Sequence, residues 1–151
     1  MKAWIALAFC LSLLLPGAPA RAEDLFLVRS DLSSPEAMAQ LQDAIVERGY
    51  TISRLQDVSA SLTKRHYKSD SYRVVFFGKV DEIRQLSAAH PELIPYLPLS
   101  ITIFAEGEQS ILIASHPRFL GTLFPDPALQ PMFARWENDL SSILDAVRAA
   151  D

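Results

Sequence analysis

Residues 99–114 read LSITIFAEGEQSILIA, two apolar runs separated by Glu106-Gly107-Glu108. The first run alternates apolar and polar side chains from Leu99 to Ile103, which is typical of a strand with one face in water. A glycine between two charged residues favours a turn, so Ile111–Ala114 is expected to return as the second arm of a β-hairpin. This stretch therefore predicts antiparallel pairing.

Three further strands are predicted before the hairpin. Leu25–Val28 is a short apolar run bounded by charge, and Tyr72–Phe77 is rich in β-branched and aromatic residues. Tyr50–Val58 is interpreted as a strand between them. The segment Ser59–Ser71 is polar and is expected to form a loop.

The most regular helical pattern follows the first of these strands. Ser33 supplies a cap, Pro35 stands in the first turn, and Glu36 comes three residues after the cap. Gly49 suits the left-handed residue that ends such a helix. Between these signals, apolar residues recur at three- and four-residue spacing, which predicts one buried helix face: Met38, Leu41, Ala44 and Ile45.

Two more helices complete the predicted order. Asp81–Ala89 is expected to stop at His90-Pro91, because a residue before proline avoids the helical region. Pro95 and Pro98 are expected to keep the next connection extended. The last helix carries the apolar stripe Phe133, Trp136, Leu140, Ile143, Leu144 and Val147. The order β-α-β-β-α-β-β-α predicts an α+β fold, with a mostly antiparallel sheet and helices on one face.

The first 22 residues have the pattern of a cleavable signal peptide. Lys2 precedes a charge-free apolar run, Trp4–Leu15, which is too short to span a bilayer, and small residues follow. Cleavage after Ala20 or after Ala22 fits, and the second is preferred. The sequence thus predicts a periplasmic or secreted protein with one α+β domain, residues 23–151, and no membrane span after cleavage.

Composition limits the function classes open to this domain. Removing Lys2 and Arg21 from the 14 basic residues leaves 12 against 18 acidic ones, a net charge of −6. Such a surface repels phosphate backbones, so no nucleic-acid partner is expected. The single cysteine, Cys10, lies in the signal peptide, which excludes disulfides and thiolate chemistry in the mature domain.

The mature chain resembles a bacterial family known as domain of unknown function 302. The resemblance is carried by the strand-helix-glycine opening from Leu25 to Gly49, by Tyr72–Gly78, by Leu97-Pro98-Leu99 before the hairpin, and by His116-Pro117 after it. It implies a curved antiparallel sheet of the TATA-binding-protein-like kind, and exported members are common. It implies no reaction. The sequence departs from the family's pattern in two places. Lys79-Val80 stands where many members have an asparagine-proline pair, and Leu99 stands where some members have a cysteine.

Polar motifs give little sign of catalysis. The three histidines lie far apart in the sequence, so no metal and no other cofactor is predicted. Ser115 and His116 are adjacent, and neighbours on a strand point to opposite faces, so they are not expected to act as a nucleophile and its base.

Two segments remain as a candidate ligand or partner surface. The first is the basic island Lys64, Arg65, His66 and Lys68. The second follows the hairpin as a proline-rich loop with unusual apolar content, Phe119–Met132, for which His116, Arg118, Phe119, Leu123 and Phe124 are the candidate residues. Each segment also has an interpretation without a ligand. The basic island is then a solvated loop, and the proline-rich segment is then a cover for the core.

Two functional hypotheses follow from these observations. The first is a non-catalytic module of the bacterial cell envelope that binds an apolar or anionic small ligand or a protein partner, with a homodimer also open. The second is an envelope enzyme whose site is assembled from scattered polar residues: His66, His116 and Arg118. The absence of a local catalytic motif favours the first.

Overall fold

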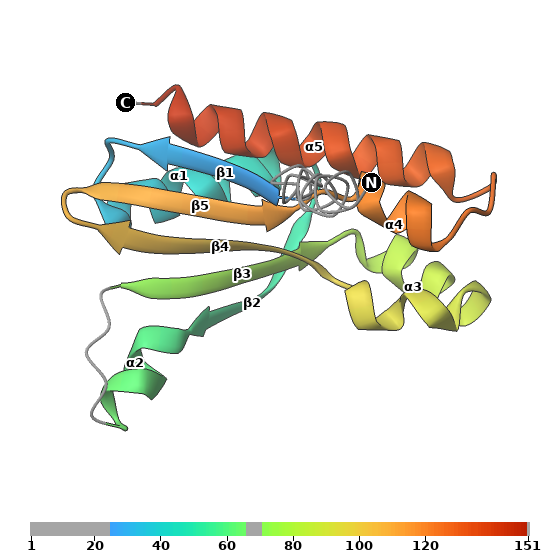
Figure 1. Cartoon of the computed structure of the whole chain (residues 1–151), viewed down its shortest axis with the longest axis horizontal. Helices are drawn as coiled ribbons and strands as arrows, with labels where there is room; N and C mark the ends of the chain where they lie inside the picture. The colour runs from blue at the N-terminus through green and yellow to red at the C-terminus, as the bar shows by residue number, and fades with distance from the viewer. Residues whose placement is uncertain (1–24, 66–70, 151) are drawn as a thin grey trace, which may run out of the picture.

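The computed structural model describes residues 25–65 and 71–150 (Figure 1). The predicted signal peptide, its cleavage sites, His66 and Lys68 all lie outside these residues. The elements, in chain order, are β1 (Leu25–Ser30), α1 (Ser34–Glu47), β2 (Thr51–Asp57), α2 (Val58–Thr63), β3 (Tyr72–Gly78), α3 (Val80–Ala89), the 3-10 helix η2 (Pro91–Tyr96), β4 (Leu99–Glu106), β5 (Gln109–Ser115), α4 (Arg118–Leu123) and α5 (Gln130–Arg148).

The strands form one open sheet of five strands in the order β1-β5-β4-β3-β2, and all four pairings are antiparallel. The predicted hairpin is β4–β5, and its turn contains Gly107 at a φ of 63°, a conformation that glycine adopts without strain. The α+β fold and the antiparallel sheet expected from the sequence are confirmed.

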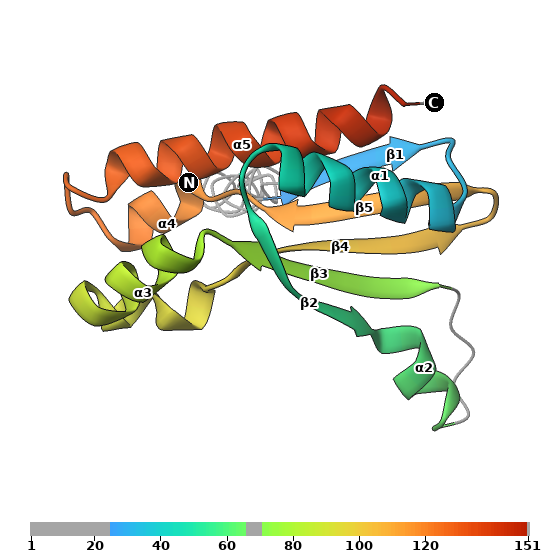
Figure 2. The ribbon, with the colours of Figure 1, turned by 180° about the vertical axis from the view of Figure 1, so that it is seen from behind.

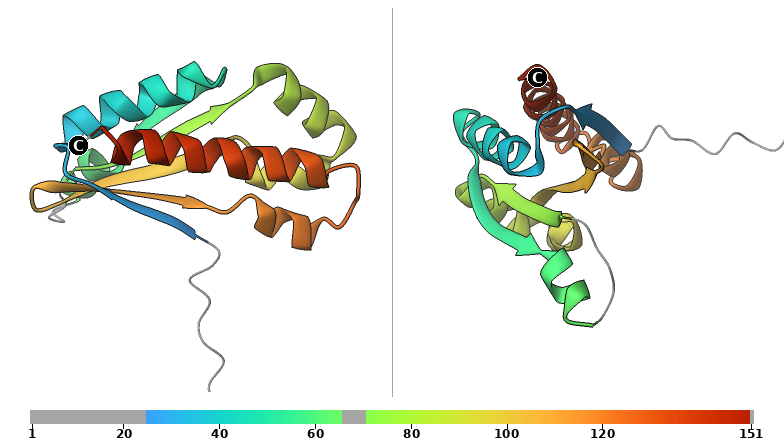
Figure 3. Two further views of the ribbon diagram at one scale, coloured as in Figure 1. Left: turned by 90° about the horizontal axis from the view of Figure 1, so that it is seen from above. Right: turned by 90° about the vertical axis from the view of Figure 1, so that its left-hand side faces the viewer.

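Helices α1 and α5 lie together along one face of the sheet (Figure 3). Their apolar stripes meet the inward-facing residues of the central strands, so that Leu41, Ile101 and Trp136 are almost fully buried in one core. The alternation predicted for residues 99–103 follows from this arrangement, because Leu99 and Ile101 face the helices while Ser100 points the other way.

The first helix begins and ends as its sequence predicts. The Glu36 carboxylate accepts hydrogen bonds from the backbone N–H (3.2 Å) and the hydroxyl (2.5 Å) of Ser33, and these contacts lower the pKa of Glu36. At the other end Gly49 has a φ of 75°, as required of a left-handed closing residue.

Three short helices correct the predicted connections. The expected extended segment after His90 is the 3-10 helix η2, which Pro91 can start because its missing N–H is not needed there. The polar loop after β2 begins as α2, and the proline-rich loop begins as α4. Figures 1 and 2 show α2 at one end of the molecule and α3 and α4 at the other.

A polar cluster fastens α3 to α5. The Glu82 carboxylate forms an ion pair with Arg135 and accepts a hydrogen bond of 3.1 Å from the indole Nε1 of Trp136. Since the Trp136 side chain is buried, Glu82 satisfies a donor that has lost water. None of the helices within residues 25–65 and 71–150 combines the length and the apolar character needed to span a bilayer.

Candidate functional site

A pocket of about 360 Å³ lies where β3 and β5 end and β4 begins. Phe76 and Ser100 are directly paired across β3 and β4, and Leu25 of β1 pairs with Ser115 of β5. Phe76 and Ser100 each alternate with a core residue, Val75 and Ile101, so they face away from α1 and α5. Leu99, which faces the helices, lines the pocket as well, so the pocket lies at this end of the sheet and includes residues from both faces. Its lining residues are Phe76, Pro95, Tyr96, Leu97, Pro98, Leu99, Ser100, Ser115, His116, Pro117, Phe119 and Leu120.

The pocket walls come from the two short helices that the sequence did not predict. Tyr96 of η2 and Phe119 of α4 both line the pocket and are both exposed. The ring of Tyr96 meets that of Phe124, which follows α4, edge to face at 5.6 Å, and this contact ties the two walls together. The same two short helices also carry the exposed apolar side chains of Ile94 and Leu123, which are not among the lining residues.

One histidine joins the pocket to α5. Nδ1 of His116 lies 2.5 Å from Oε1 of Glu137, and both side chains are largely buried, with exposed fractions of 13% and 19%. The same carboxylate accepts a hydrogen bond of 3.3 Å from the backbone N–H of Arg118, and the Arg118 Nε lies 3.7 Å from it. Glu137 thus receives donors from two neighbouring residues at the start of α4.

The Glu137 contact orients the His116 ring. Because the carboxylate occupies Nδ1, the ring nitrogen available to a pocket occupant is Nε2. The imidazole also stacks on Phe26 of β1, with 3.7 Å between ring centroids, which further restricts its rotation. With Nδ1–H donating to Glu137, Nε2 accepts a hydrogen bond when the ring is neutral and donates one when the ring is protonated.

Ser115 and His116 both line the pocket, but their surroundings differ. The His116 ring turns towards α5 and contacts Glu137 and Phe26, whereas Ser115, the last residue of β5, is exposed. No hydrogen bond joins His116 to Ser115 or Ser100 in the part of the chain that the structure describes. The three polar residues therefore share one pocket lining without a formed catalytic pair.

The structure separates the two halves of the predicted surface. His116, Arg118 and Phe119 gather at or beside the pocket, Phe124 supports its wall, and Leu123 lies exposed on α4. The described part of the basic island, Lys64 and Arg65, is exposed at the end of α2, at the opposite end of the molecule (Figure 2). These two groups do not form one site.

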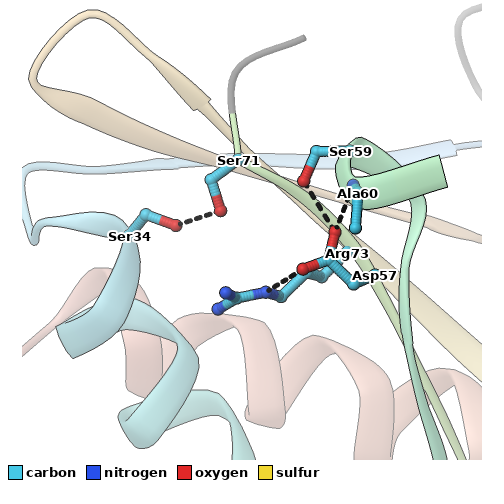
Figure 4. A network of polar contacts seen from close by, with 6 residues as sticks. All are labelled: Ser34, Asp57, Ser59, Ala60, Ser71 and Arg73. Atoms are coloured by element: carbon cyan, nitrogen blue, oxygen red, sulfur yellow. Dashed lines mark hydrogen bonds and ion pairs between the residues drawn. The ribbon is translucent and has the colours of Figure 1, made fainter. Parts of the chain in front are cut away.

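Polar contacts around Asp57 fix the start of α2, the short helix that precedes Lys64 and Arg65 (Figure 4). Asp57 caps α2: it accepts hydrogen bonds from the backbone N–H of Ala60 (2.9 Å) and the hydroxyl of Ser59 (2.7 Å), and Arg73 lies 3.6 Å away. In that order, these contacts lower the pKa of the Asp57 carboxyl. The hydroxyls of Ser34 and Ser71 meet nearby at 3.0 Å.

Sequence reasoning missed Glu137, although a signal for it was present. The apolar stripe of the last helix includes Phe133, Trp136 and Leu140, and Glu137 falls within that stripe at helical spacing. A carboxylate on a buried face needs a partner. Phe76, Tyr96 and Ser100 carried no comparable signal, because only the pairing of distant strands brings them to the pocket.

Metal binding finds no support in the described residues: within 25–65 and 71–150, no group of three or more His, Cys, Asp or Glu side chains is placed to hold an ion.

Comparison with known proteins identifies the fold's relatives. The family model described as "Domain of unknown function DUF302" matches residues 26–147. A crystal structure of an uncharacterised conserved DUF302 protein from Bacillus stearothermophilus superposes with a TM-score of 0.75 at 19% identity, covering 84% of this chain and 100% of that one. At this identity the match shows a shared fold. No curated protein matches the chain.

Proposed function

The chain belongs to the DUF302 family, a family defined without an activity, and on that premise we propose that it is a binding module whose small ligand occupies the pocket beside His116. One observation carries the proposal: the lining of a pocket with mainly apolar walls includes three polar residues, Ser100 of β4 and the adjacent pair Ser115 and His116 at the end of β5. Small-molecule sites typically combine an apolar cavity of about 300–1,000 Å³ with a few polar groups that fix orientation.

We further propose that the module acts in the bacterial cell envelope, after export and cleavage before Glu23. The support is the pattern of residues 1–22, with a basic start, a short apolar run and small residues at the end. Intact-mass measurement on protein recovered from the periplasm tests this. A mass beginning at Glu23 supports export, and full-length protein that stays in the cytoplasm contradicts it.

The pocket itself is tested by native mass spectrometry of protein purified from its own host. We expect a bound small molecule that dissociates on denaturation. Ser100→Trp should abolish it by filling the pocket. Thr102→Trp is the matched control, because Thr102 lies on the same face of β4 and does not line the pocket. Equal ligand occupancy in both variants would contradict the proposal.

A second candidate function is an envelope enzyme. The observation that favours it is the Glu137–His116 pair, since an imidazole oriented by a carboxylate is a common general base. Of the polar residues first considered for such a site, His116 and Arg118 share Glu137, while His66 lies outside the described residues. The two functions differ in outcome, because an enzyme converts the ligand recovered from the pocket and a binding module returns it unchanged.

A further inference from the structure

We propose that the pocket's ligand is a monocarboxylic acid with an apolar body, and that the protonated imidazole of His116 holds its carboxylate. This inference rests on the proposed binding function and goes beyond it by naming the ligand class. It has a thermodynamic consequence, because binding such an anion takes up a proton.

The argument begins with the charges around His116. Glu137 on α5 carries one negative charge, and Arg118 on α4, 3.7 Å from it, carries one positive charge. The element on the other side, β1, contributes only the uncharged ring of Phe26. With a neutral His116 the group has no net charge, so an incoming carboxylate would add an unbalanced negative charge at a partly buried place.

A proton on Nε2 removes this imbalance. His116 then bridges two carboxylates, with Nδ1–H donating to Glu137 and Nε2–H donating to the ligand, and both bonds are charge-assisted. Of the described residues that line the pocket, His116 alone can carry a positive charge. The hydroxyls of Ser100 and Ser115 line the same pocket and can donate to an oxygen acceptor.

The remaining lining sets the other half of the ligand. Phe76, Tyr96, Phe119 and Leu120 offer aromatic and aliphatic surface, and Pro95 and Pro98 offer no backbone N–H to a polar group. Two more apolar side chains, Ile94 of η2 and Leu123 of α4, are exposed on the helices that supply Tyr96 and Phe119. An aliphatic or aromatic body beyond a single acid group fits these walls, whereas a second charge has no partner among the described lining residues.

The test uses the mature protein and two probes of equal chain length, octanoate and 1-octanol. Calorimetric titration in two buffers with different ionisation enthalpies measures the protons taken up on binding. We expect octanoate to bind with uptake of up to one proton, and its affinity to fall by about tenfold per pH unit once free His116 has lost its proton. Octanol should bind with no proton uptake and no such pH dependence.

His116→Gln separates the roles of charge and cavity. It should weaken octanoate binding more than tenfold and abolish the proton uptake, while octanol binding persists. His90→Gln is the matched control, because His90 also lies beside a carboxylate, at 3.1 Å from Glu92, and does not line the pocket. It should bind both probes like the parent.

NMR of the histidine rings in the unmodified protein gives a second measurement that needs no variant. At a pH where the spectrum of the free protein shows a neutral His116, adding octanoate should protonate its Nε2 and leave His90 unchanged. Octanoate and octanol binding equally, without proton uptake, would overturn the ligand class and leave the pocket's binding function intact. If neither probe nor any host ligand binds, both the inference and the proposed function are wrong.

Discussion

The hydroxyl of Tyr50 donates a hydrogen bond of 2.6 Å to Oδ2 of Asp139, so the residue just before β2 is tied to α5. Tyr50 is 3% exposed, and its ring meets Phe77 edge to face at 5.5 Å. Burial and then the bond to the Asp139 carboxylate raise the pKa of the Tyr50 phenol far above its ordinary value of 10.0.

This relationship predicts a loss of stability at alkaline pH. Above pH 10 the unfolded chain ionises Tyr50 while the folded chain keeps the proton, so the free energy of unfolding falls as pH rises. At pH 8, Tyr50→Phe should cost about 1.5–3 kcal/mol, the usual contribution of a hydrogen bond to a charged group. Urea unfolding should show that the parent and Tyr50→Phe differ less in free energy of unfolding at pH 11 than at pH 8. The same difference at both pH values would contradict this account.

The Glu82 cluster predicts a graded series of stabilities. Glu82→Ala leaves the buried Nε1 of Trp136 without an acceptor and should cost about 1–3 kcal/mol. Glu82→Gln keeps an amide oxygen that can accept from Trp136, so it should recover part of that loss. Arg84→Ala, which removes only an exposed ion pair with Asp81 on the same helix, should change stability by less than about 0.5 kcal/mol. Equal losses from the three variants would show that Glu82 does not clamp α3.

A side chain at position 78 should destabilise the protein, and a second substitution at Ile83 should restore part of the loss. A Cβ at this position would lie 2.2 Å from Cδ1 of Ile83 and 3.7 Å from Cβ of Pro98. Because Cδ1 is the end of a half-buried side chain, Gly78→Ala should displace it and cost about 0.5–1.5 kcal/mol, the usual cost of forcing a side chain off its rotamer. Ile83→Val removes the clashing methyl group, so the double variant should be more stable than the sum of the two single losses allows. If the losses in free energy of unfolding of the two single variants simply add in the double variant, the clash with Ile83 is not the cause of the instability.

The segment after β5 predicts three different responses to truncation. Phe133 is 1% exposed, and Phe133→Ala should cost about 3–5 kcal/mol. Phe124 packs only partly against the core and touches Tyr96, so its truncation should cost clearly less and should also loosen the pocket wall. Leu123 is exposed, and Leu123→Ala should leave the melting temperature nearly unchanged. Calorimetry with light scattering measures stability and association together. A Phe124→Ala protein that melts like the parent but loses a partner would make this segment an interface.

The elements predicted from sequence are those with a strong local signal. The capping residues and apolar periodicity of residues 33–49 fix α1 without help from the rest of the chain. The hairpin is equally local, since its two arms and its glycine turn are contiguous. By contrast, η2 and α4 were not predicted because they lie in proline-rich segments. Proline is equally compatible with an extended segment and with the first turn of a helix.

The candidate site could be predicted only in part, for a related reason. His116, Arg118 and Phe119 are near neighbours in sequence, and the structure places them at or beside the pocket. Their chemical character depends on Glu137 from the last helix and on Ser100 and Phe76 from two other strands. These positions meet because of the strand register and the packing of α5, which no single segment encodes. The basic island was a separate prediction, made from its charge, and Lys64 and Arg65 lie at the other end of the molecule (Figure 2).

The strand order also bears on how the chain reaches this structure. Three of the four strand pairings join consecutive strands, but β1 pairs with β5, near the other end of the described chain. The end of α5 also closes on β1, where the Ser30 hydroxyl donates to the carbonyl of Val147 at 3.4 Å. During synthesis β1 therefore emerges first and finds its partners last. Its inward-facing residues, such as Val28, stay uncovered throughout that interval, which leaves residues 25–30 open to aggregation and to capture by a chaperone.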